Sequence, residues 1–292
     1  MFAIRRILLV ILLVGLTSAV LLSFLIYSNW HIGARESVAV DFSPSHSPAA
    51  SEWDMLLGRS EYVLHVCCQH SSRSIPAFRD ARGPVRMFEV RDTDPPVRLG
   101  YRAELRLRPD YMGHDRWYQG RIFVPADWVN VGAPVIAMQW HATRNIFLGE
   151  LGTLPPLALA IHQGAWHLSK AWTKHWYAGT DRPVEGVRDI AKVALTTGAW
   201  SEWKFHVRWA PDETGFIKAW LNGKPVVDEP GPIGYRDLFG PYLKVGVYIP
   251  AWSSTGPEPN IATRVLVFDV AESAASAAAL HSSATRIGER SE

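Results

Sequence analysis

The feature that most constrains the fold is an alternation of apolar and polar residues with a period of two, repeated through the middle of the chain. This period is typical of strands, because successive side chains point to opposite faces of a sheet. Eight segments show it and are predicted strands: 102–107, 117–124, 135–141, 157–162, 203–209, 216–221, 243–249 and 264–270. Many strands without helical spacers predict an all-β sandwich.

Two turn signals and the composition agree with this fold class. Asn222-Gly223 follows a predicted strand and is a strong hairpin signal, whereas Gln163-Gly164 is a weaker one. The 22 glycines, 20 prolines and 13 tryptophans among 292 residues are typical of a turn-rich β protein. A formal net charge of only +2 argues against a nucleic-acid partner. The adjacent Cys67 and Cys68 cannot form a disulfide framework, and we expect two unpaired thiols rather than a vicinal disulfide.

The two ends of the chain differ from its middle. Arg5 and Arg6 precede an uncharged apolar stretch, 7–27, long enough to span a bilayer as a helix. A cleavable signal peptide usually has a shorter apolar region, so we predict an uncleaved membrane anchor, with secretion after cleavage as the alternative. The paired arginines predict a cytoplasmic N-terminus and an extracytoplasmic domain.

These differences divide the chain into four predicted parts. Residues 1–30 form the anchor, and residues 31–60, rich in Ser, Pro and Ala, form a linker. Residues 61–271 form the β domain, and residues 272–292 form an Ala/Ser-rich tail that frays or forms a loose helix.

Three of the predicted strands combine an apolar face with a face that carries polar groups. The polar faces hold Arg102, Glu104 and Arg106; Gln139 and His141; and Tyr242, Lys244, Gly246 and Tyr248. One such face alone is most simply the solvated side of a sandwich, and the arginines flanking Glu104 could form a plain ion-pair ladder. Gly246 favours a binding site over a plain solvated face, because a glycine within a strand often marks close approach by a ligand.

Taken together, these residue types fit β-elimination from a uronic acid. The reaction removes the proton at C5, which requires a base, and His141 and Tyr248 are suitable proton-transfer groups. The neighbouring carboxylate must be neutralised as charge accumulates, and Arg and Gln side chains can donate hydrogen bonds to it. Lys244, on the same face as Tyr248, would stabilise the tyrosine in its ionised form.

The same segments resemble the jelly-roll polysaccharide lyases, the group that contains alginate lyases, glucuronan lyases and heparin lyase I. The similar strings run in family order and cover residues 85–91, 102–106, 139–141, 198–209, 220–224 and 242–248. The chain looks closest to the heparin lyase I-like and glucuronan lyase-like members. The resemblance implies a concanavalin-like β-jelly roll with the substrate groove along one sheet.

The resemblance also implies roles for individual residues. His141 and Tyr248 would be the proton-transfer pair, while Gln139 and Arg102 would neutralise the substrate carboxylate, with Arg106 as second choice to Arg102. Three further residues, Lys244, Glu104 and Tyr242, would bind substrate or orient these groups. In addition, Trp176 belongs to an aromatic cluster with Trp166, Trp172 and Tyr177 that would either stack on sugar rings or serve in packing.

The substrate and cofactors are constrained by what the sequence lacks. Alginate lyases commonly have Gln soon after the last Tyr, whereas Ile249-Pro250 follows here. Dense Lys/Arg clusters, which sulfate groups would require, are missing near the similar strings, so a non-sulfated polyuronate such as glucuronan is the expected substrate. No metal ligands are predicted and no cofactor is required, although a structural calcium ion assembled from distant loops is compatible with the sequence.

Two other functions are open at this stage. A non-catalytic carbohydrate-binding module of the same fold would use the aromatic residues without needing His141 and Tyr248 together. A jelly-roll glycoside hydrolase would need two carboxylates facing one bond, and the three polar faces offer only Glu104, which its arginine neighbours would hold ionised.

Overall fold

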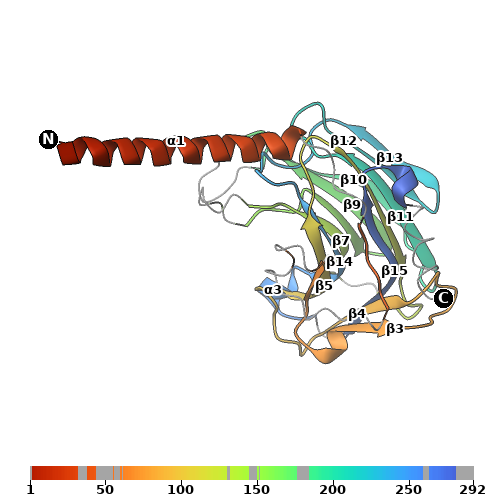
Figure 1. Cartoon of the computed structure of the whole chain (residues 1–292). Helices are drawn as coiled ribbons and strands as arrows, with labels where there is room; N and C mark the ends of the chain where they lie inside the picture. Colours follow the sequence, from red (N-terminus) through yellow and green to blue (C-terminus); the bar gives the residue numbers. More distant parts are fainter. Residues whose placement is uncertain are drawn as a thin grey trace, which may run out of the picture.

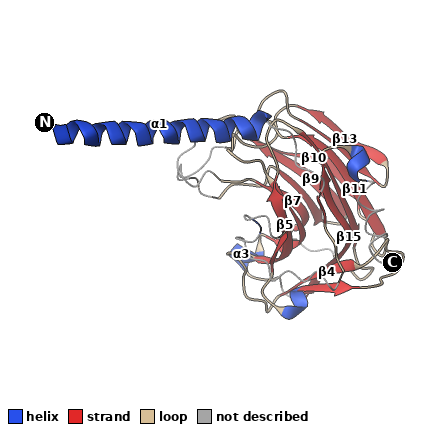
Figure 2. Cartoon of the chain, viewed as in Figure 1, coloured by secondary structure: helices blue, strands red, loops and turns tan. Residues whose placement is uncertain are grey.

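The alternating segments form two antiparallel sheets in the computed structural model, which describes residues 2–31, 38–43, 55, 60, 62–129, 132–144, 150, 152–175, 184–258 and 263–280. The eight predicted strands are all present, as are both predicted hairpins. Asn222 and Gly223 have φ values of 50° and 76°, which are the left-handed values that a two-residue hairpin turn requires. Figure 2 shows that the body consists of strands with only short helices.

The first sheet has eight strands among the described residues. Its spatial order is β13 (Lys224–Pro230), β12 (Phe216–Leu221), β11 (Trp200–Arg208), β6 (Asp115–Phe123), β15 (Thr263–Ala274), β4 (Val85–Arg91) and β3 (Ser72–Ile75), with β1 (Val38–Ala39) pairing with β15. The second sheet has seven described strands in the order β10 (Gly186–Ala194), β9 (Ala165–Trp172), β8 (Leu157–His162), β7 (Val135–His141), β14 (Tyr242–Ile249), β5 (Tyr101–Pro109) and β2 (Tyr62–His65).

Aromatic side chains fill the space between the sheets. Trp140 of β7 is fully buried and packs edge-on against Phe205 of β11 and Tyr118 of β6, at ring-centroid distances of 4.8 and 5.2 Å. Trp166 packs in the same way against Trp203. Of the four aromatic residues considered for sugar stacking, Trp166 therefore belongs to the core, while Trp176 and Tyr177 lie outside the described residues.

The β body extends further toward both ends of the chain than we predicted. Val40 and Phe42, in the predicted linker, are buried in the core next to β1. At the other end, β15 continues to Ala274, and Arg116 donates a 2.7 Å hydrogen bond to the buried Ser273 hydroxyl. Neither segment was predicted, because each is too short to show an alternation of apolar and polar residues. β1 has two residues, and β15 extends three residues beyond the predicted end of the domain at residue 271.

The N-terminal helix α1 (Phe2–His31) extends from the β body as a straight rod in Figure 1. Its segment Arg5–Phe24 is long and apolar enough to cross a membrane, and its side chains are exposed. A membrane span and a signal sequence both fit this finding.

Candidate active site

The three strands with polar faces are neighbours, because β14 pairs with β7 on one side and with β5 on the other. Lys244 is opposite Gln139 on β7 and opposite Arg106 on β5. The intervening residues Trp140 and Val245 are buried in the core. The polar groups of all three strands therefore share the face of the sheet that is turned away from the core, which we call the site face.

The centre of the site face is the buried carboxylate of Glu104. It accepts hydrogen bonds from Gln139 Nε2 and Lys244 Nζ, and Arg102 Nη1 lies 3.3 Å from Oε2. Glu104, Gln139 and Lys244 are each at most 2% exposed. Burial raises the pKa of Glu104, but the charges of Lys244 and Arg102 and the two hydrogen bonds outweigh it, so the pKa lies below its ordinary value. This carboxylate is therefore ionised.

Tyr248 is held beside Arg102 rather than beside His141. The Arg102 guanidinium carbon lies 4.0 Å from the centre of the Tyr248 ring, and the two residues are opposite each other across β5 and β14. Gly100 makes this packing feasible, because a Cβ atom there would lie 2.6 Å from Arg102 Nη2 and 2.9 Å from Tyr248 Cε2. Gly100 was not predicted from the sequence, although its position directly before the strand is a usable signal.

His141 is stacked on the other tyrosine, Tyr242. The two rings are 5.3 Å apart and nearly parallel, and the Arg106 guanidinium carbon lies 4.0 Å from the centre of the same tyrosine ring. Because β7 and β5 flank β14, Tyr242 lies between His141 and Arg106. Arg106 thus contacts an aromatic ring, and the second cation on Glu104 is Lys244 instead.

The protonation state of His141 follows from its surroundings. Its Nδ1 lies 3.0 Å from the carbonyl oxygen of Ala142, so Nδ1 carries the proton of the neutral ring and Nε2 can accept one. The pKa of His141 is lowered to about 4, mainly by burial and also by the positive charges of Lys244 and Arg102, which together outweigh the raising effects of the Ala142 hydrogen bond and the Glu104 charge. His141 is therefore neutral at pH 7 and able to act as a base.

Gly246 has a different role from the one we predicted. Its φ is +142°, and a Cβ atom there would collide with the carbonyl oxygen of Ala103 and lie 2.8 Å from the Cα atom of Glu104. The close approach is therefore made by the backbone of β5 and not by a ligand. The β7–β14 register also shifts between Val245 and Tyr248.

The structure brings together most of the predicted site residues. Arg102, Glu104, Gln139 and Lys244 are in direct contact. His141 and Tyr248 share the site face but are not opposite each other, because Tyr248 pairs with Ile136, five residues before His141 on β7. At about 3.3 Å per residue, the two lie about 16 Å apart along the strands, whereas Tyr242 is directly opposite His141. His65 is the last residue of β2 and is opposite Glu104.

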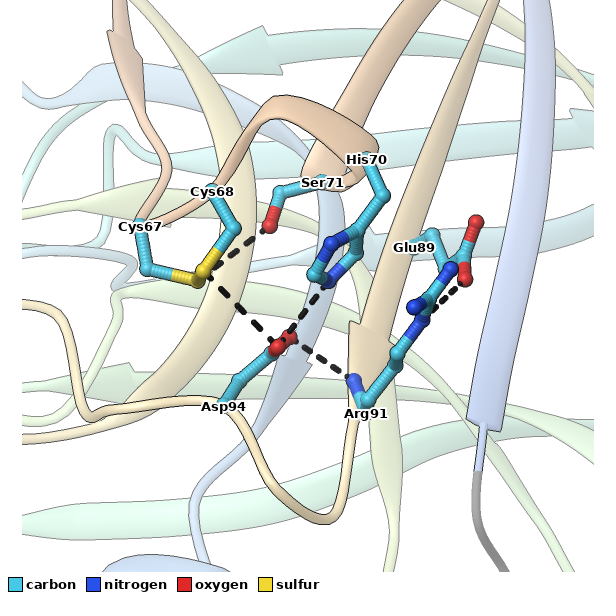
Figure 3. The surroundings of a disulfide bond; sticks show 7 residues. All are labelled: Cys67, Cys68, His70, Ser71, Glu89, Arg91 and Asp94. Atoms are coloured by element: carbon cyan, nitrogen blue, oxygen red, sulfur yellow. Dashed lines mark hydrogen bonds and ion pairs between the residues drawn. A yellow bond between two sulfur atoms is a disulfide. The ribbon is translucent and has the colours of Figure 1, made fainter.

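The prediction of two unpaired thiols was wrong, because Cys67 and Cys68 form a disulfide. Figure 3 shows it next to Asp94, whose carboxylate is 2.9 Å from His70 Nε2 and accepts the backbone N–H of Arg91. The two sulfur atoms and Asp94 have the spacing of metal ligands. Because the sulfur atoms are bonded to each other, they are not available as thiolates.

Comparisons with known proteins agree with the predicted fold. The structure is similar to an endo-β-1,4-glucuronan lyase from the fungus Trichoderma reesei, with 20% identity, a TM-score of 0.61, and coverage of 76% of this chain and 90% of the other. An alginate lyase from Pseudomonas aeruginosa is 17% identical, with a TM-score of 0.43 and coverage of 70% and 88%. No curated protein sequence matches the chain. A family model described as polysaccharide lyase matches residues 50–271.

Proposed function

This chain belongs to the polysaccharide lyase family, and from that premise we propose that it cleaves a non-sulfated polyuronate, such as glucuronan, by β-elimination. One observation carries the proposal: Arg102, Arg106 and Lys244 share the site face with Glu104, the one carboxylate among the residues of β5, β7 and β14. An excess of cations on this face favours an acidic sugar chain. Sulfated chains would require more clustered basic residues than the sequence contains near the site.

In the proposed mechanism, Arg102 neutralises the carboxylate of the uronate at the cleavage point. Its side chain is 11% exposed, whereas Lys244 and Gln139 are buried beneath the site face. Glu104 holds Arg102 in place and is ionised, so the salt bridge persists. Gln139 donates to Glu104 in this structure, and it reaches the substrate by turning its amide away from Glu104.

Tyr242 takes the place of Tyr248 in the predicted proton-transfer pair, because it is opposite His141 and stacked on it. The register places Tyr248 about 16 Å along the strands from His141, too far for one sugar ring. His141 and Tyr242 carry the protons. One of them removes the C5 proton; the C4–O bond breaks, a C4=C5 double bond forms, and the leaving oxygen takes up a proton from the other. His141 suits the role of base because it is neutral with Nε2 as acceptor. Tyr242 suits the second role because its ring is stacked on His141, which places both groups beside the same sugar.

Tyr248 is assigned to support rather than to proton transfer. The Arg102 guanidinium contacts its ring, so its position serves to fix Arg102. A hydrolase mechanism is disfavoured, because Glu104 is buried and ionised and cannot act as a general acid. The proposed chemistry uses protein groups alone and requires no metal ion or organic cofactor.

The test is to incubate the full chain, purified in detergent, with glucuronan, alginate and a sulfated glycosaminoglycan. We expect glucuronan to give the ultraviolet absorbance of an unsaturated uronate, with no change in rate when a chelator is added. Reducing ends that appear without this absorbance would contradict β-elimination. Faster cleavage of the sulfated polymer would contradict the proposed substrate.

We also propose that α1 is an uncleaved anchor and that the lyase domain is extracytoplasmic. The length of the apolar segment Arg5–Phe24 and the Arg5-Arg6 pair at its start support this orientation. A polymer too large to cross a membrane would then be accessible to the site face.

A further inference from the structure

Two histidines lie on the site face at a distance from the groups described above. His167 of β9 is opposite Ala160 of β8, which is opposite Ile136 of β7, which in turn is opposite Tyr248 of β14. Three strand spacings of about 4.8 Å therefore place His167 about 14 Å from Tyr248 at the backbone. Because opposite residues share a face, His167 belongs to the same surface as Tyr248.

The second histidine, His162, ends β8 and packs against His167. Their ring centroids are 5.7 Å apart at an interplanar angle of 64°, and His167 Nδ1 lies 3.4 Å from Asp189 Oδ2. His162 Nδ1 and His167 Nε2 are buried, and neither has a hydrogen-bond partner within the described part of the chain. A buried nitrogen without a partner is destabilising, and a ligand oxygen at this place would satisfy it.

The β8 and β9 part of this surface has short side chains. Ala158 and Ala160 of β8 and Ser169 of β9 occupy it, with Ala158 opposite Gln139 and Ser169 opposite Ala158. Ile136 of β7 is the larger side chain between Ala160 and Tyr248. An extended polymer lying across the strands would therefore meet low side chains over β8 and β9. Lys192 of β10, opposite His167, adds a positive charge at the far side.

We propose that His162 and His167 form a distal binding subsite for the polysaccharide. They bind hydroxyl or carboxylate oxygens of a sugar unit several units away from the cleaved bond, through His162 Nδ1 and His167 Nε2. Asp189 lies beside His167 Nδ1, which leaves Nε2 as the position for the ligand. Because His162 Nδ1 and His167 Nε2 are both buried in this structure, the imidazole rings must turn outward to present them to a sugar. This inference rests on the proposed function, because it takes the polyuronate as the ligand.

The experiment compares cleavage of long glucuronan with cleavage of the shortest oligomer that the enzyme accepts. In the double variant His162→Ala/His167→Ala, we expect the ratio of kcat/KM on the long substrate to kcat/KM on the short one to fall about tenfold, as expected for two lost hydrogen bonds. The fall in this ratio should come from a higher KM for the long substrate. The matched control is His206→Ala on β11 of the other sheet, where His206 Nε2 is 3.0 Å from Asp115 Oδ2, and it should leave the ratio unchanged.

A ratio equal to that of the unaltered enzyme would overturn the subsite. Should thermal unfolding show that the double variant is not folded, the single variants His162→Ala and His167→Ala replace it, and each should lower the ratio about threefold. An unchanged ratio in both would overturn the subsite. If no polyuronate is cleaved, the proposed function fails separately. Retardation in gels containing each polyuronate then tests the subsite, and equal retardation of variant and parent in all of them overturns it.

Discussion

Tyr242 and Tyr248 differ in their neighbours more than in their positions on β14. Tyr242 contacts His141 and Arg106, whereas Tyr248 contacts Arg102 and packs against Gly100. A phenol that transfers a proton must have its oxygen at the substrate, while a phenol that fixes its neighbours acts through its ring. Removing the hydroxyl and retaining the ring therefore separates the two roles.

We expect Tyr242→Phe to lower kcat on glucuronan by at least about 100-fold, because general acid–base catalysis contributes that much. Tyr248→Phe keeps the ring contact with Arg102 and should lower kcat by less than about tenfold. Steady-state kinetics of the two variants, with thermal unfolding as a control for folding, measure the difference. The reverse order of losses would assign the proton transfer to Tyr248.

The pKa of His141 predicts a pH dependence of stability. It is about 4 in the folded chain and about 6.5 in the unfolded chain, so the unfolded chain binds the proton first as the pH falls. The stability contributed by His141 is constant above pH 6.5, falls between pH 6.5 and 4, and is constant again below pH 4. His141→Gln lacks this dependence, so the melting temperatures of the two proteins should converge as the pH is lowered through this window.

The activity of the unaltered enzyme tests the same assignment independently. If His141 is the base, kcat/KM should decline only as the pH approaches about 4, where the imidazole becomes protonated. A decline centred near pH 6.5 would show that the base is a histidine with an ordinary pKa. His141→Gln should lower kcat by at least about 100-fold at pH 7.

At the level of strands, the sequence pattern predicted the fold where a strand was long and had one apolar face and one polar face. β5, β7 and β14 each have an apolar face and a polar face, and all three were predicted, together with the residues of the site face. β10 was missed because its residues are mostly exposed on both faces, and β1 has only two residues. The pairing of Glu104 with Lys244 was also missed, because it depends on the β5–β14 register and not on spacing within one strand.

The contact between β5 and β14 gives a prediction at this level. Gly246→Ala should destabilise the fold strongly, because it combines a positive φ with a collision against the backbone of β5. Gly223→Ala is the matched control, because Gly223 also has a positive φ but a methyl group added there would meet no atom within 4 Å. Denaturant unfolding should show a loss about 2 kcal/mol larger for Gly246→Ala than for Gly223→Ala. Equal losses would mean that the backbone of β5 moves away from the added methyl group without a loss of folding free energy.

The whole molecule combines a polar site face with an apolar N-terminal helix. The cationic groups lie on one sheet, and the other face of that sheet packs in the core with Trp140 and Val245. The proposed anchor would keep α1 in the bilayer and leave the site face accessible to a polymer outside it. The 20 residues Arg5–Phe24 span about 30 Å as a helix, which matches the hydrocarbon core of a bilayer.

An uncleaved anchor predicts where the mature chain begins and where it is found. The chain should keep its N-terminal residues, remain with membranes after an alkaline wash, and expose its β domain to protease only from the extracytoplasmic side. N-terminal sequencing of the membrane fraction and of the culture medium measures this. Replacing Leu12 and Leu13, which are exposed apolar residues of α1, with arginine should release the chain from the membrane, because each charge near the centre of a span costs about 3 kcal/mol. A soluble product that begins after residue 19 would instead identify the segment as a cleaved signal peptide.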